Sequence, residues 1–227
     1  MQSLILEYKD VTLGYDQDVI LKDINISIES GVLLPFVGPN GSGKSTMFKS
    51  MLGFIKQQKG SITRNFGQCC PGYVPQQKNL DPLYPISVRQ IVEMGLYSKT
   101  NFLGILDKSE KEKLNETIEK LGLSDSQMKN FGELSGGLKQ KTLIARSLVG
   151  GANIIFMDEP VAGLDAASEE MIINLLIKLN KNENKTILLV HHKLEDLSKL
   201  SAKVCLVDKQ TVCLCSAQEA WESLNKR

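Results

Sequence analysis

One short segment constrains the fold of this chain more than any other. Residues Gly38 to Ser45 read GPNGSGKS and fit the pattern G-x-x-x-x-G-K-[ST] at every fixed position. A short apolar run, Val32–Val37, comes before the segment, and a helical pattern follows it from Lys44 to about Phe54. An ordinary glycine-rich turn needs neither of these neighbours. The order of strand, loop and helix therefore predicts a phosphate-binding loop in an α/β fold.

Each residue type in this loop suits a bound phosphate group. Glycines let backbone N–H groups approach phosphate oxygens, and the following helix points its positive N-terminal end at the same oxygens. Lys44 is expected to reach the β- and γ-phosphates, and the Ser45 hydroxyl is expected to bind Mg²⁺. The residues predicted to hold the nucleotide, here named the first cradle, are Gly38, Pro39, Asn40, Gly41, Ser42, Gly43, Lys44, Ser45 and Thr46.

A second apolar strand ends in two acidic residues. Ile154–Met157 is followed directly by Asp158 and Glu159. A strand that is buried on both faces delivers such carboxylates to the edge of the sheet where ligands bind. Asp158 would then lie in the Mg²⁺ shell, and Glu159 would orient and deprotonate an attacking water. The alternative is that the two acids cap the next helix.

The rest of the chain is organised around these two motifs. The opening has β patterns at 4–8, 19–21 and 24–28, and the last third alternates strands with helices. Such alternation predicts a mostly parallel sheet covered on both faces. Between these parts, residues of about 83–150 have mainly helical patterns. Pro35 is unexpected within Val32–Val37, because proline removes a hydrogen-bond donor from a central strand.

Composition excludes several classes of protein. The 227 residues carry 27 basic and 26 acidic side chains, and this balance argues against a dedicated nucleic-acid binder. No apolar run reaches the about 18 residues that span a bilayer, and the N-terminus lacks the features of a signal peptide. Five cysteines form an odd set, unlike a secreted disulfide framework. We therefore expect a reduced, cytoplasmic chain.

A second glycine-bearing segment has the chemistry of an anion site. In Leu134–Leu138 a serine and two glycines precede a helical pattern, which offers a hydroxyl, free N–H groups and a helix dipole. We name Ser135, Gly136 and Gly137 the second cradle. One site seldom needs two γ-phosphate cradles. The simplest explanation is that the second cradle closes over a nucleotide held by another subunit.

With these motifs in this order, the chain resembles the ATP-binding subunit of ABC transporters over nearly its whole length. The resemblance implies that Ser135–Gly137 belongs to the signature motif. It further implies that Tyr15 stacks on adenine, and that Gln76 contacts Mg²⁺ and senses a membrane partner. Asp165 would lie at a dimer interface, and His192 would reach the γ-phosphate.

Taken singly, several of these residues have simpler explanations. Tyr15 alone is typical of half-buried strand packing, and Gln76 alone is typical of a solvated loop. The adjacent residues His191 and His192 suggest a metal site, but neighbouring side chains on a strand point to opposite faces. Cys213 and Cys215 share a strand face, yet two thiols fall short of a four-ligand zinc site.

Three residues depart from the family pattern. Leu138 stands where the signature usually continues with glutamine, so turnover is expected to be low. Lys193 follows the histidine where an acidic residue is common, and Lys141 replaces an arginine but keeps the charge. None of these changes affects the proposed reacting groups, and hydrolysis is still predicted.

Residues 81–88 and 91–95 resemble the corresponding stretch of zinc, manganese and iron importers, and the Val190–His192 run is also frequent in that subgroup. Residues 77–105 would form the groove for the coupling helix of a permease. The alternative is generic packing of a helical subdomain. The metal itself would be carried by the permease and an external binding protein.

The predicted fold is a P-loop NTPase core of the α/β class, with a mostly parallel sheet, an N-terminal antiparallel β arm and an inserted helical subdomain. Residues 1–82 and 151–227 would form the core, and 83–150 the insertion. The predicted function is an ATP-hydrolysing motor for a metal importer, peripheral on the inner face of the cell membrane.

The predicted ligands are ATP and Mg²⁺. The predicted partners are a second copy, a permease and an extracytoplasmic substrate-binding protein, without nucleic acid. The alternatives are an ATP-gated interaction module with little turnover, a transporter of a non-metal substrate, and a soluble protein of DNA repair or translation.

Overall fold

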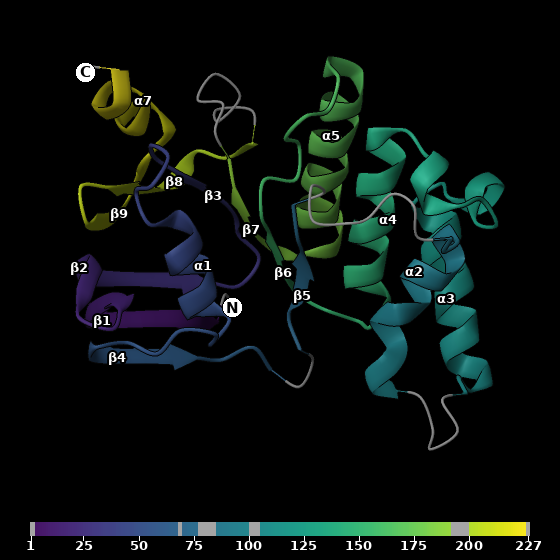
Figure 1. Ribbon diagram of the computed structural model, residues 1–227, viewed down its shortest axis with the longest axis horizontal. Coiled ribbons are helices and arrows are strands. Elements are labelled where there is room, and N and C mark those ends of the chain that lie inside the picture. The colour runs from purple at the N-terminus through teal and green to yellow at the C-terminus, as the bar shows by residue number, and fades with distance from the viewer. Residues whose placement is uncertain (1–2, 68–69, 77–84, 100–104, 192–199, 226–227) are drawn as a thin grey trace. The chain divides into compact units, whose positions relative to one another are not determined.

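The computed structural model describes residues 3–67, 70–76, 85–99, 105–191 and 200–225. The chain forms two compact units, which are described separately (Figure 1). The first unit comprises Met1–Gly67 and Ile177–Arg227, and the second comprises Gln68–Leu176. These boundaries differ from the predicted subdomains, whose limits stay a prediction.

An antiparallel sheet opens the first unit. It contains β1 (Leu4–Tyr15), β2 (Asp18–Glu29) and β4 (Lys59–Arg64) in the order β2-β1-β4. In the second half of β2, apolar residues from Ile24 to Ile28 are buried and alternate with exposed polar ones, as a sheet with one buried face requires. The predicted β arm is therefore confirmed, with longer strands than the sequence indicated.

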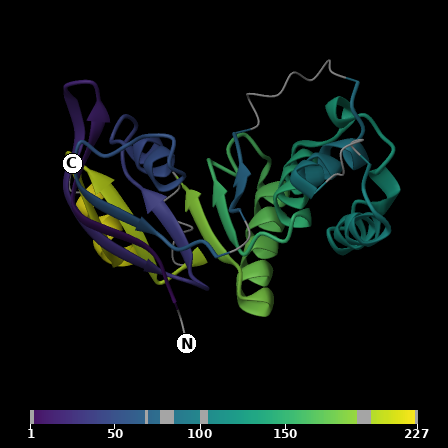
Figure 2. The same ribbon diagram turned by 90° about the horizontal axis from the view of Figure 1, so that it is seen from below.

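The parallel strands of the first unit carry the phosphate-binding loop. β3 (Leu33–Val37) pairs in parallel with β7 (Thr186–Val190) and with β8 (Lys203–Asp208), and β9 (Thr211–Ser216) pairs antiparallel to β8. Every residue of β3 and β7 is buried, which explains why both are apolar apart from Thr186. Figure 2 shows the yellow C-terminal strands beside the purple N-terminal ones, and β9 contacts β2.

Pro35 fits this sheet because its missing donor falls where no partner is needed. The carbonyl oxygens of Val32 and Phe36 accept bonds from the β7 side, at 2.8 and 3.0 Å. Alternation along the strand then turns the nitrogen of Pro35 toward β8. The pairing of β3 with β8 begins only at Phe36. The expected disturbance of pairing is therefore absent on the β7 side, where Pro35 stands in register with Leu189.

Two helices complete the description of the first unit, α1 (Lys44–Met51) and α7 (Ala217–Asn225). Phe48 of α1 meets Phe36 of β3 edge to face, with ring centroids 5.0 Å apart. The hydroxyls of Tyr8 and Ser50 share a buried 2.9 Å hydrogen bond, and burial raises the pKa of Tyr8. These contacts fix α1, and with it the loop that precedes α1, on the strands.

The second unit is mainly helical. Its strands β5 (Gly72–Val74) and β6 (Ile154–Met157) pair in parallel. Its helical elements are α2 (Val88–Glu93), η2 (Met94–Lys99), α3 (Lys108–Lys120), η3 (Ser124–Ser126), η4 (Phe131–Glu133) and α4 (Gly136–Val149). Helix α5 (Ala166–Glu183) begins in this unit and ends in the first. Both α2 and α3 contact α4, and all three bury aliphatic side chains.

Several elements differ from expectation. Within the predicted helical stretch of about 83–150, α2 starts with a capping box at Ser87 but is followed by the 3₁₀ turns of η2 after Glu93. The helix that the alternation of strands and helices predicts between β7 and β8 lies almost entirely outside the described residues. Strands β4 and β5 and helix α7 were not predicted, whereas β9 contains Cys213 and Cys215, which were expected on one strand. Among the described residues, no helix is long and apolar enough to cross a membrane.

Candidate nucleotide-binding site

The first cradle joins β3 to α1 and leaves the start of α1 open to a ligand. Gly43 precedes the helix with a φ of 102°, and no side chain caps the helix there. Such a left-handed conformation favours glycine. The N–H groups of the first turn are therefore not satisfied by a capping side chain, and a phosphate group is a suitable partner for them.

Lys44 is held inside its own loop. Its side chain is 6% exposed, and its ammonium donates to the carbonyl oxygens of Gly38 and Pro39, each at 2.8 Å. A buried ammonium beside a glycine-bearing loop is suited to a polyanion. The fixed position of this charge is what phosphoryl transfer needs, because catalysis there depends on positioning and on charge stabilisation.

Two serines of the first cradle carry hydroxyls with different surroundings. The Ser42 oxygen is buried and has no hydrogen-bond partner among the described residues. A buried polar group in this state favours a ligand that satisfies it. Ser45 is exposed in the first turn of α1, where its hydroxyl is accessible to a metal ion held by phosphates.

Tyr15 ends β1 and presents an aromatic surface. The side chain is 45% exposed, and the ammonium of Lys49 lies 6.0 Å from its ring centroid. An exposed ring held at a strand end can stack on a base. The predicted adenine contact therefore has the required exposure and remains a prediction.

In the second unit, the structure brings Gln76 and Glu159 together. The side-chain amide of Gln76 donates to a carboxylate oxygen of Glu159 at 2.7 Å. Glu159 has a φ of 51°, a left-handed value that is uncommon for a residue with a side chain. Strained backbone of this kind is concentrated at functional sites, and here it is found at the predicted base.

Asp158 is anchored one residue earlier. Its N–H donates to the carbonyl oxygen of Val74 at 2.9 Å, which extends the pairing of β5 with β6. Burial, with a smaller effect from the nearby Asp158 carboxylate, raises the pKa of Tyr73. Among the described residues, no group of three or more histidine, cysteine or acidic side chains could hold a metal. Magnesium in phosphoryl-transfer sites commonly needs only one or two carboxylates beside the phosphates.

The second cradle is built differently from the first. Ser135 caps α4 by accepting a hydrogen bond from the N–H of Leu138 at 3.4 Å. Gly137 packs against α5, where an added Cβ would lie 2.8 Å from the end of Met171. Asp165 accepts bonds from the N–H and hydroxyl of Ser168 at 2.9 and 2.7 Å, and these bonds lower the pKa of Asp165.

Not every predicted site residue can be located. His192 lies outside the described residues, whereas the preceding His191 is buried and donates its N–H to Phe36. The first cradle belongs to the first unit, and Gln76 and Glu159 belong to the second. Their meeting around one nucleotide stays a prediction.

These motifs match a known family. The sequence model described as ABC transporter matches residues 21–162. The chain belongs to the ABC transporter family. It is an ATPase in which hydrolysis of ATP to ADP and phosphate is coupled to transport.

Curated relatives of this ABC ATPase match most of its length. A manganese transport system ATP-binding protein of Listeria innocua is 36% identical over 91% of this chain and 88% of the relative. A zinc transport system ATP-binding protein of Treponema pallidum is 36% identical over 91% of this chain and 79% of the relative.

Solved structures agree on the fold. A metal-chelate type ABC transporter in an inward-facing conformation has a TM-score of 0.88 and 26% identity, over 99% of this chain and 90% of its own. A dimeric ATP-binding cassette bound to ADP and phosphate, in a post-hydrolysis state, has a TM-score of 0.75 and 27% identity, over 94% of this chain and 99% of its own. The predicted P-loop NTPase fold of this ABC ATPase is thereby confirmed.

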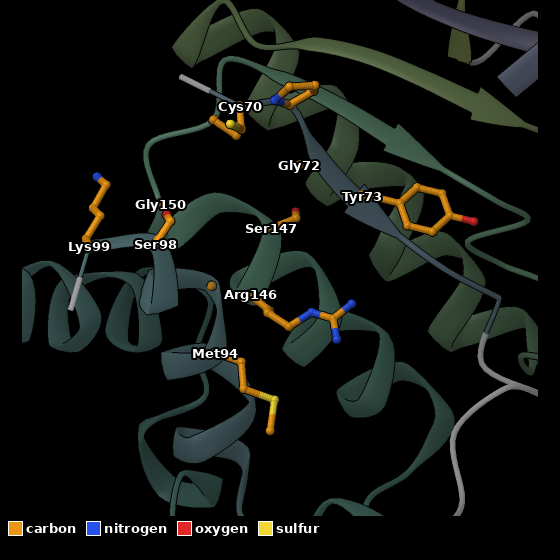
Figure 3. A pocket seen from close by; sticks show the side chains of 12 residues that line it. Cys70, Gly72, Tyr73, Met94, Ser98, Lys99, Arg146, Ser147 and Gly150 are labelled. Carbon is orange, nitrogen blue, oxygen red and sulfur yellow. The ribbon is translucent and has the colours of Figure 1, made fainter. Parts of the chain in front are cut away.

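Sequence reasoning on the ABC ATPase missed a pocket in the second unit. The pocket has a volume of 560 Å³ and is lined by residues of β5, η2 and the end of α4. Figure 3 shows Met94, Lys99 and Arg146 around it, and burial lowers the pKa of the Arg146 guanidinium. The resemblance implied a partner groove within 77–105, but it did not predict that residues at the end of α4 line the pocket.

Proposed function

We propose that this chain is the ATP-hydrolysing subunit of a metal-ion importer. Relatives named for manganese and zinc transport support the cargo, since they are 36% identical over 91% of the chain. The metal itself is carried by a separate permease, which receives it from an extracytoplasmic binding protein. The chain lies on the cytoplasmic face of the membrane through that permease.

The observation that carries the proposed motor function is the 2.7 Å hydrogen bond between Gln76 and Glu159. Glu159 acts as general base, because its carboxylate directly follows a buried strand and is held in one orientation. Gln76 contacts this base and directly precedes residues 77–105, where the partner groove is expected. Displacement of Gln76 would release the base, and its return would hold the base again.

Residues of the site fit Mg²⁺. The Ser45 hydroxyl, the Asp158 carboxylate and the amide oxygen of Gln76 are hard oxygen donors, and the Gln76 nitrogen is already used toward Glu159. When bound, the ion neutralises charge on the phosphates. Lys44 contributes a fixed positive charge to the same oxygens, and His192 contacts the γ-phosphate.

A second copy of the chain completes each site. The second cradle has a long 3.4 Å cap bond at Ser135, which an external phosphate can replace at small cost. Asp165 is exposed, and its neighbour Leu164 would lie 2.8 Å from a Cβ added at Gly136 of this cradle. Two copies would therefore hold two ATP molecules between the first cradle of one and the second cradle of the other.

The pocket in Figure 3 is the candidate docking site for the permease. It offers an apolar side chain, Met94, together with the cations Lys99 and Arg146. A short cytoplasmic helix with apolar and acidic side chains would complement this lining. The docking site and the base Glu159 belong to the same unit, which supports coupling between them.

The dimer is tested with Glu159→Gln, which keeps the shape of the base but removes its charge. Size-exclusion chromatography with ATP and Mg²⁺ should show a dimer for this variant. Adding Lys44→Ala to it should return the protein to a monomer. A Glu159→Gln protein that binds ATP but stays monomeric contradicts the two-copy site.

The cargo is tested in cells. Affinity capture from solubilised membranes should recover the permease, and uptake of Mn²⁺ or Zn²⁺ should collapse with Glu159→Gln. If uptake of both metals is intact in that variant, the metal assignment is wrong.

A second candidate function is an ATP-gated interaction module with little turnover. Leu138 favours it, because an aliphatic side chain stands beside the second cradle, where the family usually has glutamine. Steady-state phosphate release separates the two candidates. Release that disappears in Lys44→Ala supports the motor, whereas tight ATP binding without release supports the module.

A further inference from the structure

A pocket of 370 Å³ opens beside the first cradle, within the first unit. Three segments line it: the loop at 39–42, the start of β2 at Val19 and Ile20, and the turn Asp208–Gln210 between β8 and β9. The turn is far from the loop in sequence, but β9 lies against β2 (Figure 2). The family motifs described above include no residue of this turn.

Hydrogen bonds hold the turn in this place. The N–H of Lys22 donates to the Gln210 carbonyl oxygen at 2.9 Å. The Gln210 side-chain amide donates to the Val19 carbonyl oxygen at 3.3 Å. Since Val19 lines the same pocket, these bonds fix the turn against another wall of the pocket.

The turn keeps side chains where glycine would be easier to accommodate. Lys209 has a φ of 44° and Gln210 has a φ of 68°. Two-residue hairpin turns with both values positive favour Asn-Gly, because a Cβ crowds the backbone in this region. Strain of this kind persists where the side chain has a use.

The charges of the residues that line the pocket indicate a role for the Lys209 side chain. Among the described residues that line it, Lys209 is the cation and Asp208 is the anion. Ser42 lines the pocket as well, and its buried hydroxyl has no hydrogen-bond partner among the described residues. Without Lys209, this wall would present only a carboxylate to a polyphosphate of the same sign.

We propose that Lys209 is a nucleotide-binding residue of this ATPase, which places a cation at the polyphosphate held by the first cradle. The inference concerns affinity for ATP and assigns Lys209 no part in bond breaking. It rests on ATP binding by the first cradle and is independent of the transported cargo.

The test compares Lys209→Gln with Lys203→Gln on the purified chain. Both changes remove one positive charge from β8 or its end, but Lys203 begins the strand and Lys209 follows its last residue. Calorimetric titration should show an ATP Kd about three- to fivefold higher for Lys209→Gln. The Kd of ADP should rise less, because it carries less charge. Lys203→Gln should leave both unchanged, and Lys209→Arg should retain the original affinity.

A second variant separates binding from turn geometry. Lys209→Gly relieves the positive φ as it removes the charge, so its thermal unfolding midpoint should rise while its affinity for ATP falls. A higher midpoint with unchanged ATP affinity would mean that the turn is only structural, and it overturns the proposal. An equal loss of affinity in Lys203→Gln also overturns it. Failure of the unmodified chain to bind ATP would instead reject the first cradle.

Discussion

The two cradles of this chain lie at helix N-termini but satisfy the N–H groups there in different ways. Gly43 precedes α1 in a left-handed conformation, without a capping side chain. Ser135 precedes α4 in an extended conformation and caps the helix with its own hydroxyl. The first terminus therefore has no side-chain cap in place of a ligand, whereas Ser135 caps one N–H group of the second through a 3.4 Å bond.

Glycine also has different tasks in the two cradles. At Gly41, with a φ of 76°, an added Cβ would meet nothing within 4 Å. At Gly137, an added Cβ would lie 2.8 Å from Met171 and 2.9 Å from the Ser168 hydroxyl. Gly41 is therefore needed for its backbone conformation, whereas Gly137 allows α4 to pack closely on α5. Mutations in the two cradles should therefore have different effects.

The largest expected effect is that of Lys44→Ala in the first cradle. ATPase activity should fall about 100- to 1,000-fold, because a preorganised charge is lost from the phosphates. Steady-state phosphate release measures the loss, and circular dichroism checks that the fold persists. A folded variant with normal activity would show that the first cradle is not the catalytic one.

Gly136→Asp should damage the second cradle alone. The added carboxylate would repel a phosphate held by another copy, and activity should fall about 10- to 100-fold. Affinity of the isolated chain for ATP should stay within about twofold, because its own first cradle is intact. Equilibrium dialysis at low protein concentration measures that affinity. A matching loss of ATP affinity would mean that both cradles act within one copy.

A smaller difference is expected between the free energies of unfolding of alanine variants at Gly41 and Gly137. Gly41→Ala should cost about 1–2 kcal/mol, because alanine is strained at a positive φ. Gly137→Ala should be close to neutral, because the gain in helix propensity of about 1 kcal/mol offsets the crowding of the flexible Met171 end. Urea unfolding of both variants measures the difference. Equal losses would remove the distinction between conformation and packing.

Local sequence patterns predicted the phosphate-binding loop, the strand before it and the acidic end of the second buried strand. The run from Val32 to Val37, the glycines after it and the acids after Ile154–Met157 each have a local pattern, because strand burial and tight turns restrict residue type directly. The resemblance implied that Gln76 contacts Mg²⁺, whereas its 2.7 Å bond to Glu159 was not predicted.

Other elements had no local signal. β5 is only Gly72–Val74, and β4 (Lys59–Arg64) has no buried residue, so neither shows a clear apolar period. The positive φ of Lys209 could not be predicted, because lysine is not a residue that favours that region. Tertiary contacts impose it, through the bonds that tie the turn to β2.

The smallest expected effect concerns Leu138, which stands next to the second cradle. Leu138→Gln adds an amide where the side chain is partly exposed in the first turn of α4, so it can donate to a phosphate held by another copy. Turnover should rise about two- to fivefold, the size of one added polar contact. Leu138→Ala is the matched control, because it removes the aliphatic side chain without adding a donor. The two variants should differ in kcat measured at saturating ATP. If kcat rises by the same factor in both variants, the leucine obstructs closure by its bulk, and the second cradle needs no additional donor.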